Sequence, residues 1–333
     1  MAPHPQRLTL TRRAWPLARP LMTAHGVETT VDIVVAELSD VESRGRGEGV
    51  PLRRYGESIE SVVAALEAMK GAIYSGLARD TLQSAMPPGA ARNALDCAFW
   101  DMDAKRAYQS VAELAELGAV TPVVTAFTLD FDTPDKMAEQ AEANRSRPLL
   151  RLELWGDGDI ERVRAVRQAA PTARIIVDAH ERWSEVQLRG FLPALSDCRV
   201  EMVEQPLPAD ADDVLARLGS PIPFCADEAC RTVGDLDRLD GKYQAVNIKL
   251  DKVGGLTEAL ALAADAKRRG LRIVAGGTVC TSLGIAPALL LAQQAAIVDL
   301  EGPLHLAVDR GARLRYDGST IHPPDPKLWG GPD

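Results

Sequence analysis

The sequence predicts an α/β fold in which a TIM-like barrel follows an α+β region of about 115 residues. After about residue 120, short apolar runs alternate with segments that have the periodicity of amphipathic helices. Apolar strands separated by helices are typical of a parallel sheet that is covered on both faces. Eight such units in about 190 residues favour a closed (β/α)₈ barrel over an open sheet.

The elements of the first part are predicted from local patterns. Residues 8–10 and 31–38 favour strands, and residues 43–55, which are rich in Gly and Arg, favour a turn and loop. Residues 58–77 and 91–105 carry apolar side chains at helical spacing.

The barrel elements follow in strict alternation. The predicted strands are 123–128, 149–153, 174–178, 200–204, 224–227, 245–249, 271–275 and 296–299. The predicted helices between them are 134–144, 159–169, 184–195, 212–218, 233–239, 256–269 and 282–294.

Composition excludes several classes of protein. The 333 residues include 38 Lys and Arg against 47 Asp and Glu, a net charge of −9, which disfavours nucleic-acid binding. There is no run of 18 apolar residues for a membrane helix, and the first residues lack the apolar core of a secretory signal. Five cysteines without a Cys-x-x-Cys motif fit reduced thiols in the cytoplasm. We therefore expect a cytoplasmic protein that acts on a small molecule.

Ionisable side chains end most of the predicted barrel strands. They are Glu153, Asp178, Glu204, Asp227, Lys249 and Asp299. Because the carboxyl ends of barrel strands share one face, these groups should converge where barrel enzymes carry out chemistry. A carboxylate at a strand end can also cap the next helix, which is the structural alternative for each residue taken alone.

Three of these carboxylates lie on adjacent strands. Asp178, Glu204 and Asp227 would repel one another unless a cation or protons compensate their charge. A ligand set made only of oxygen atoms suits Mg²⁺. Lys249, one strand further on, is either a counter-ion of this cluster or a general base, since a neighbouring cation can lower its pKa towards neutrality. Metal and lysine together suit removal of a proton α to a carboxylate.

Several long motifs carry a resemblance to a known family. They are RYGES (54–58), GAARNALDCAFWD (89–101), IVDA (176–179), VEQPLP (203–208), CADE (225–228), VNIKLDKVGGLTEALALA (246–263) and DLEGPLHLAVD (299–309). In these motifs the sequence resembles the enolase superfamily, its muconate-lactonizing subgroup, and within that the dipeptide epimerases of the L-Ala-D/L-Glu type.

The resemblance implies a modified (β/α)₇β barrel (residues 116–310) under an α+β capping domain (1–115), with a tail (311–333) that returns to the cap. It implies Mg²⁺ ligands at Asp178, Glu204 and Asp227, a catalytic base at Lys249, and a site for the α-ammonium of a dipeptide at Asp299 and Glu301. Cap loops at 15–26 and 48–55 would set specificity, and we expect His25 to contact the substrate. A homo-oligomer is also expected.

The second barrel strand departs from the family. Its usual Lys-x-Lys is replaced here by Arg151 and Glu153, so the base on the second face of the substrate is missing. Glu153 is one candidate for that base, although neighbouring carboxylates should raise its pKa, and Arg151 on the same face can offset them. The enzyme can instead use one face only, as in a β-elimination, or α-proton chemistry can be lost.

A second departure is His180, which stands two residues after Asp178 where the family usually has Asn. Histidine is the side chain best suited to proton transfer near neutral pH, and Asp-x-His resembles acid-sugar dehydratases of the same superfamily. The alternative is a histidine that only replaces the hydrogen bonds of Asn.

The first hypothesis is therefore a Mg²⁺-dependent epimerase acting on a dipeptide or N-acyl amino acid, with Lys249 and Glu153 as bases and Arg151 contacting the substrate carboxylate. The second is a lyase that uses Lys249 and His180, and the third is a metal-binding relative without activity.

Overall fold

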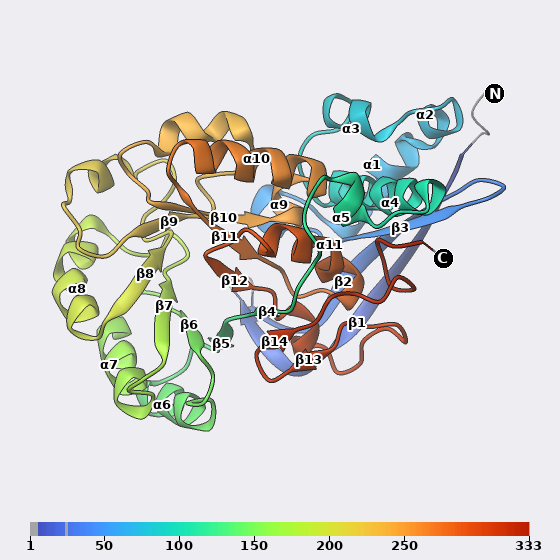
Figure 1. Ribbon diagram of the computed structural model, residues 1–333. Coiled ribbons are helices and arrows are strands. Elements are labelled where there is room, and N and C mark those ends of the chain that lie inside the picture. The colour runs from blue at the N-terminus through green and yellow to red at the C-terminus, as the bar shows by residue number, and fades with distance from the viewer. Residues whose placement is uncertain (1–5, 24–25, 333) are drawn as a thin grey trace.

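The computed structural model describes residues 6–23 and 26–332 (Figure 1). An N-terminal unit of one antiparallel sheet and several helices, blue to blue-green in Figure 1, lies beside a barrel of parallel strands. In these two ranges no helix has the length and apolarity needed to cross a membrane. His25 lies outside the described residues, so its contact with the substrate stays a prediction.

The N-terminal unit, which we call the cap, is built on a sheet of order β1-β2-β3. Its strands are β1 (Arg7–Thr23), β2 (Gly26–Ser39) and β3 (Arg44–Gly49). The cap loop expected at 15–26 is wrong up to Thr23, because β1 and β2 pair as far as Thr23 with Gly26. Backbone pairing in this hairpin continues through polar sequence that the side-chain pattern alone did not mark as a strand.

The loop expected at 43–55 is wrong in its first half, where β3 forms. Gly45, Gly47 and Gly49 alternate along β3, so all three face the same side of the sheet. A Cβ on Gly47 would lie 2.1 Å from the carbonyl oxygen of Ala94 in the long helix α4 (Ala90–Ala107). The glycines therefore remove every side chain between strand and helix, and the helix backbone packs directly on β3.

The other helices of the N-terminal part lie before and after α4 in the chain. They are η1 (Arg53–Tyr55), a 3₁₀-helix, and α1 (Ile59–Ala68), α2 (Lys70–Tyr74), α3 (Arg79–Ala85) and α5 (Val111–Leu114). Two of them, α1 and α2, contact β2 and β1. Val34 and Leu38 of β2 pack in one buried cluster with Leu66 of α1 and with Leu95 and Phe99 of α4. The predicted helix at 58–77 is thus two helices that meet at Met69.

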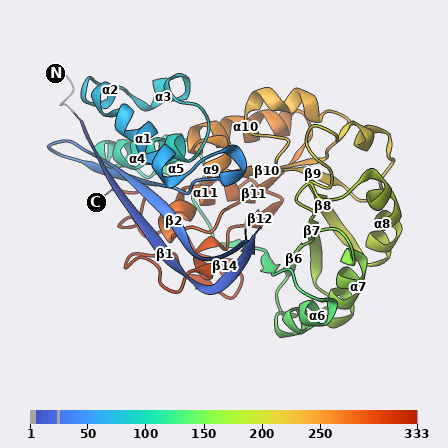
Figure 2. The ribbon, with the colours of Figure 1, turned by 180° about the vertical axis from the view of Figure 1, so that it is seen from behind.

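Eight parallel strands form the predicted barrel, seen from the other side in Figure 2. They are β5 (Phe127–Leu129), β6 (Leu149–Glu153), β7 (Arg174–Asp178), β8 (Val200–Glu204), β9 (Phe224–Ala226), β10 (Ala245–Lys249), β11 (Arg272–Gly276) and β12 (Ile297–Asp299). The strands pair in chain order, and the amide of Ala126 donates to the carbonyl of Val298 (2.7 Å) across the remaining gap.

Each of the eight strands, or the residue directly before it, contributes one apolar side chain to a buried cluster inside the barrel. This small buried cluster consists of Ala126, Leu149, Ile176, Met202, Cys225, Ala245, Val274 and Ile297. Ala126 directly precedes β5, and the others are the first, second or third residues of their strands, so this part of the interior is filled with apolar atoms. The polar residues further along the same strands are left for the opposite, carboxyl-terminal face.

Helices connect the barrel strands and cover the outside of the barrel, except the short helix directly after β10, whose Lys252 reaches Asp227, and the 3₁₀-helix after β12, which contacts β1. They are α6 (Pro134–Ala143), α7 (Asp159–Ala169), α8 (Glu185–Asp197), α9 (Leu250–Val253), α10 (Leu256–Arg268) and α11 (Ser282–Ala292), with 3₁₀-helices η2 (Asp213–Arg217), η3 (Val233–Leu239) and η4 (Gly302–His305). The predicted helices at 212–218 and 233–239 are therefore 3₁₀, the form that short helical segments often take.

The C-terminal tail contacts both parts of the molecule. Its strands β13 (Tyr316–Asp317) and β14 (Thr320–Ile321) pair with each other, and β14 also pairs with β4 (Val123–Val124). The single strand expected at 123–128 is therefore divided between this sheet and β5. Near the end of the chain, the indole of Trp329 donates to the carbonyl of Cys97 in α4 (3.0 Å). The division into residues 1–115, 116–310 and 311–333 stays a prediction.

Candidate active site

Three carboxylates meet at the carboxyl ends of neighbouring strands. Asp178 ends β7, Glu204 ends β8, and Asp227 directly follows β9. One oxygen of each lies within 4.8 Å of the others, and all three side chains are buried. The predicted metal ligands are therefore together, because parallel pairing aligns the ends of these strands, with Asp178 opposite Glu204.

The negative charges of the three carboxylates repel one another, and a bound cation would relieve this repulsion. Burial and the charge of Asp178 raise the pKa of Glu204 to about 8. The amide of Asn247 donates to Glu204 (2.5 Å), which holds this carboxylate in the cluster. Buried carboxylate oxygens that repel one another are a suitable donor set for a hard divalent cation such as Mg²⁺. The residues present therefore fit the metal that the resemblance implies.

Two lysines approach the cluster from the side of β10. Lys249 donates to one oxygen of Asp227 (2.5 Å), and Lys252 donates to the other (2.6 Å). Burial alone would raise the pKa of Asp227, but both ammonium groups outweigh it and lower this pKa. Burial would also lower the pKa of Lys249, but the charges of Asp227 and Glu204 outweigh it and raise that pKa. The fall expected for Lys249 therefore requires a bound cation.

Sequence reasoning missed two residues of this site. Lys252 is only 2% exposed and also donates to the carbonyls of Asp227 (2.6 Å) and Asn247 (2.7 Å). The short helix α9 begins directly after Lys249 and turns Lys252 back towards the barrel. Asn247 lies two residues before Lys249 on β10, so the period of two along a strand was the signal that could have identified it.

Arg151 lies among carboxylates. Its two terminal nitrogens donate to Glu153 and to Asp178, and its Nε lies 3.4 Å from Asp299 and 3.7 Å from Glu204. This side chain is almost fully buried, and its Nε has no hydrogen-bond partner in the described part of the chain. The guanidinium therefore offsets the negative charge on the β6 side of the site, and Nε is the part of it left for a further acceptor.

Glu153 is hydrogen-bonded to His180, whose ring nitrogen Nε2 contacts the second carboxylate oxygen. Burial alone would raise the pKa of Glu153, but His180 and Arg151 outweigh it and lower this pKa. The raised pKa expected for Glu153 is thus wrong, because the sequence did not show how close His180 lies. Burial would lower the pKa of His180, but the charges of Asp178 and Glu153 raise it to about 10. The two side chains form an ion pair.

The backbone holds His180 in this position. Its φ angle is 48°, in the left-handed region that non-glycine residues rarely adopt, and its amide donates to Asp178 Oδ1 (2.9 Å). Strain at a residue beside a metal-type cluster is typical of functional sites. His180 is therefore aimed at Glu153 by the same carboxylate that takes part in the triad.

Lys249 and the Glu153–His180 pair lie on opposite sides of the triad. In the order of the barrel sheet, β6 and β10 are four strands apart, with β7, β8 and β9 between them. In an eight-stranded barrel, four strands are half the circumference. Two groups that can exchange protons thus lie across the barrel mouth from each other, with the carboxylate triad between them.

Asp299 and Glu301 occupy the remaining side of the barrel mouth. Burial, opposed by the charge of Arg151 and assisted by that of Glu301, raises the pKa of Asp299 to about 6. Glu301 accepts from the amide of Thr128 (2.8 Å) and lies 3.6 Å from His305. The structure therefore brings the two predicted ammonium ligands together, and Asp299 keeps acceptor capacity for a cation.

The cap closes over the barrel mouth through the 53–55 segment. Arg54 forms an ion pair with Glu181, the residue after His180. Burial and the charges of Asp227 and Glu228 raise the pKa of Tyr55, so its hydroxyl faces the acidic site. Arg231 lies over the ring of Tyr55 at 4.0 Å. A part of the predicted cap loop at 48–55 thus reaches the site.

Comparison with known proteins gives a consistent result. Residues 6–117 match the mandelate racemase/muconate lactonizing enzyme N-terminal domain, and residues 136–326 match the enolase C-terminal domain-like model. The chain is 44% identical to L-Ala-D/L-Glu epimerase of Escherichia coli (strain K12), over 93% of this chain and 97% of the relative. It is 43% identical to N-acetyl-D-glutamate racemase of Pseudoalteromonas sp, over 90% and 95%.

A crystal structure provides the comparison in three dimensions. An enolase family member from Agrobacterium tumefaciens, with homology to dipeptide epimerases and with bound sodium and L-Ala-L-Glu, superposes with a TM-score of 0.95. It is 45% identical to this chain, and the match covers 98% of this chain and 100% of that one.

Proposed function

Because the chain belongs to the mandelate racemase/muconate lactonizing enzyme family of the enolase superfamily, we propose that it is an isomerase that inverts a carbon α to a carboxylate. The substrate is a dipeptide or an N-acyl amino acid. The observation that carries this proposal is the position of Lys249 across the barrel mouth from the Glu153–His180 pair. Inversion requires one group to remove the proton and another to return one from the opposite face.

Lys249 is the proton-transfer group of one face. Its ammonium is held on Asp227 and lies 3.9 Å from Glu204, so its position is fixed at the edge of the triad. On the other face, the Glu153–His180 pair takes the place of the lysine that the family usually carries. A histidine held by a carboxylate keeps one ring nitrogen oriented for proton transfer, and the pair therefore acts as one unit that gains and loses one proton.

We assign Asp178, Glu204 and Asp227 as ligands of Mg²⁺. A bound Mg²⁺ would supply positive charge for the carboxylate of the substrate and for the enediolate formed from it, and would lower the pKa of Lys249. Asn247 and Lys252 hold Glu204 and Asp227 in place for this ion. Arg151 limits the repulsion between the triad and Glu153, and its free Nε is a contact for the substrate carboxylate.

Asp299 and Glu301 favour a dipeptide over an N-acyl amino acid. The charge of Glu301 helps to raise the pKa of the buried Asp299, and two neighbouring carboxylates gain stability when an ammonium group lies between them. A dipeptide carries such a group and an N-acyl amino acid does not. L-Ala-L-Glu and N-acetyl-glutamate are therefore the pair of substrates that separates the two classes.

Proton exchange in D₂O tests the proposed function. The protein with Mg²⁺ is incubated with each substrate, and deuterium incorporation at Cα is measured by NMR together with configuration. Exchange with inversion is the expected result, because it requires both faces. Exchange with complete retention would show that Lys249 works alone and would contradict the second-face role of Glu153 and His180. Absence of exchange on all dipeptides and N-acyl amino acids would contradict the isomerase proposal as a whole.

A lyase is the second candidate, and the ion pair of His180 favours it. The environment holds a proton on His180 well above neutral pH, so this ring can donate to a leaving group while Lys249 removes the α-proton. A hydroxy-acid substrate that releases water would reveal this activity, and His180→Asn would abolish it. Should turnover with every substrate class fail, the third reading, a metal-binding relative that lost its activity with the second lysine, would remain.

Three further expectations stay predictions of the sequence. They are the domain limits at residues 115 and 310, assembly into a homo-oligomer, and action in the cytoplasm.

A further inference from the structure

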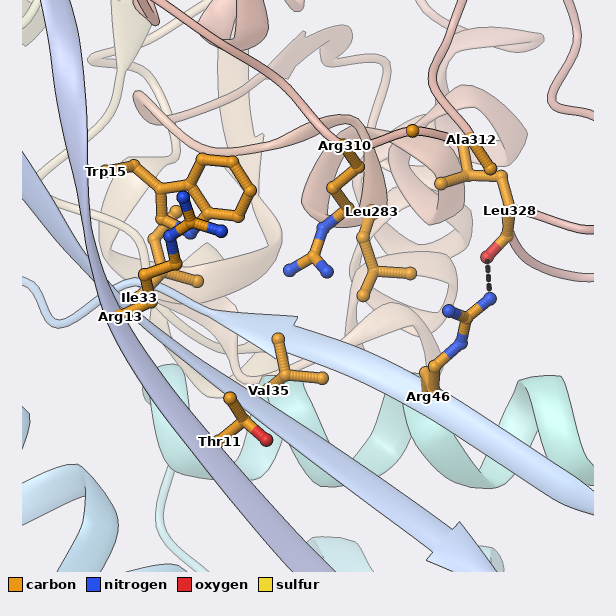
Figure 3. A pocket seen from close by; sticks show the side chains of 11 residues that line it. Thr11, Arg13, Trp15, Ile33, Val35, Arg46, Leu283, Arg310, Ala312 and Leu328 are labelled. Atoms are coloured by element: carbon orange, nitrogen blue, oxygen red, sulfur yellow. Dashed lines mark hydrogen bonds between the residues drawn. The ribbon is translucent and has the colours of Figure 1, made fainter.

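A second cavity lies between the cap and the C-terminal tail. Its volume is about 350 Å³, and strands β1, β2 and β3 form one wall (Figure 3). The other wall comes from Leu283 of α11, from Arg310 directly before the tail, and from tail residues including Leu328. Three parts of the chain that are far apart in sequence thus border one partly open space, and none of the residues assigned above to the barrel site lines it.

Three arginines line this cavity. Arg13 lies on β1, Arg46 on β3 and Arg310 between η4 and the tail, and Figure 3 shows Arg13 and Arg310 on the side of Trp15 and Arg46 on the side of Leu328. The guanidinium of Arg13 lies 4.1 Å from the centre of the Trp15 ring, and that of Arg310 lies 5.5 Å from it. One indole ring therefore contacts two cations from different parts of the fold.

Only one of these three arginines forms an ion pair with a carboxylate in the described part of the chain. Arg310 pairs with the buried carboxylate of Glu48 (2.7 Å), whereas Arg46 donates to the backbone carbonyls of Lys327 (2.8 Å) and Leu328 (3.0 Å). Within the described part of the chain, the guanidinium of Arg13 interacts with the ring of Trp15 and with no carboxylate. Among those residues Glu48 is the one carboxylate in an ion pair with the three, so the cavity carries an excess of positive charge.

We propose that this cavity is a binding site for a small dianion, a dicarboxylate or a phosphate monoester, separate from the barrel site. Guanidinium groups present paired N–H donors whose geometry matches carboxylate and phosphate oxygens. Arg13 and Arg46, on the first and third strands of the sheet, are the groups with donors left for the ligand. The proposal does not depend on the proposed isomerase function.

The walls of the cavity limit the ligand. Between the arginines lie the apolar side chains of Ile33, Val35 and Leu283, of which Ile33 and Leu283 are buried. A ligand with two anionic ends and a short carbon body satisfies both the charged rim and this apolar floor. Because cap, barrel helix and tail all contribute, the bound anion links them and stabilises the folded chain.

Calorimetric titration of the full-length protein tests the proposal. Glutarate and inorganic phosphate are the two probes, each at constant ionic strength maintained with chloride. We expect saturable binding of at least one probe with a dissociation constant of about 1 mM or lower. We also expect the melting temperature to rise by about 2–4 °C at saturation. Tighter binding of glutarate would identify a dicarboxylate as ligand, and tighter binding of phosphate a phosphate monoester.

Two variants localise the binding. Arg13→Gln should weaken it by about tenfold to hundredfold, since a charge-assisted contact is lost. Arg12→Gln is the matched control, because Arg12 is the neighbouring residue on β1 and faces the other side of the sheet, and its ion pair in the described part of the chain is an exposed one with Glu60 (4.0 Å). It should bind as the unmodified protein does.

Several outcomes would overturn the proposal. No saturable binding of either probe would exclude the site. Equal affinity in the unmodified protein and in Arg13→Gln would place the anion elsewhere. Loss of binding in Lys249→Met with retention in Arg13→Gln would place it in the barrel site.

Discussion

The carboxylate of Glu153, at the end of β6, is hydrogen-bonded to Nε2 of His180, which follows β7. The strands are neighbours, and Glu153 lies opposite Asp178 in the register, so two residues of separation bring His180 within reach. In the proposed function, this carboxylate–histidine pair takes the place of the usual second-face lysine.

Glu153→Gln should abolish inversion while exchange on the face of Lys249 continues. The uncharged amide no longer forms an ion pair with His180, and loss of one acid–base group costs about 10²- to 10⁴-fold in rate. Inversion is followed by polarimetry and exchange by NMR in D₂O. Glu201→Gln is the control, since Glu201 forms an exposed ion pair with Arg174 on the outside of the barrel. Unchanged inversion in Glu153→Gln would exclude a second-face role for this residue.

Asp299→Asn should separate dipeptides from N-acyl amino acids. A charge-assisted hydrogen bond to an ammonium contributes about 1.5–3 kcal/mol, so kcat/KM for L-Ala-L-Glu should fall about tenfold to hundredfold. For N-acetyl-glutamate, which has no ammonium, the change should be much smaller, and this substrate serves as the internal control. An equal loss with both substrates would show that Asp299 does not recognise the ammonium.

Chelation of divalent cations with EDTA should abolish turnover and lower the melting temperature, and Mg²⁺ should restore both. Asp178, Glu204 and Asp227 lose their counter-charge when the ion leaves, and a ligand at one hundred times its dissociation constant stabilises a fold by about 2.7 kcal/mol. Glu204→Gln should weaken the response of the melting temperature to Mg²⁺. Full turnover in EDTA would argue against metal-dependent chemistry.

Asp251 should make the protein less stable as pH rises. Burial raises its pKa to about 7, although its carboxylate accepts from the amide of Val50 (3.0 Å) and from Asn93 (2.7 Å). In the unfolded chain this carboxyl loses its proton near pH 4, whereas in the folded protein it keeps the proton to about pH 7. Between these values the folded state binds more protons, so the free energy of unfolding falls by up to about 1.4 kcal/mol per pH unit.

Asp251→Asn should remove this part of the pH dependence. The amide oxygen can still accept from Val50 and Asn93, and its NH₂ group can donate to the hydroxyl of Thr278. Urea unfolding at several pH values measures the slope, with the exposed Asp317→Asn as control. A slope in Asp251→Asn that equals that of the unmodified protein would contradict the assignment.

Gly47→Ala should destabilise the cap by at least about 1–3 kcal/mol. The new Cβ would lie 2.1 Å from the carbonyl oxygen of Ala94 and 2.7 Å from the amide nitrogen of Ala98, and neither backbone atom can move without shifting α4. Gly118→Ala is the control, because no heavy atom lies within 4 Å of its added Cβ. Equal stability of the two variants in urea would show that β3 and α4 separate more easily than their packing indicates.

The barrel could be predicted closely because its strands are apolar and its helices amphipathic. The bounds of β6, β7, β8 and β10 agree with the prediction, and Asp178 and Glu204 lie at the ends of β7 and β8 as expected, whereas their role as metal ligands stays a prediction. The strand β3 could not be found in the same way, since its glycines are selected by contact with α4 and not by strand propensity. The alternating glycines of β3 are explained only by the close packing of this strand on α4.

The sequence alone determined which chemical groups the site contains, because a strand of known direction places its last residue at the barrel mouth. The tertiary structure decided how these groups are partnered. The ion pair of Glu153 with His180, the four carboxylates around Arg151 and the position of Lys252 beside Asp227 depend on distances between elements. Charge and protonation follow from those distances, since Coulomb interactions in a buried site change steeply over a few ångströms. The type of each side chain is thus set by the sequence, whereas its protonation state depends on neighbouring charges that only the folded chain brings together.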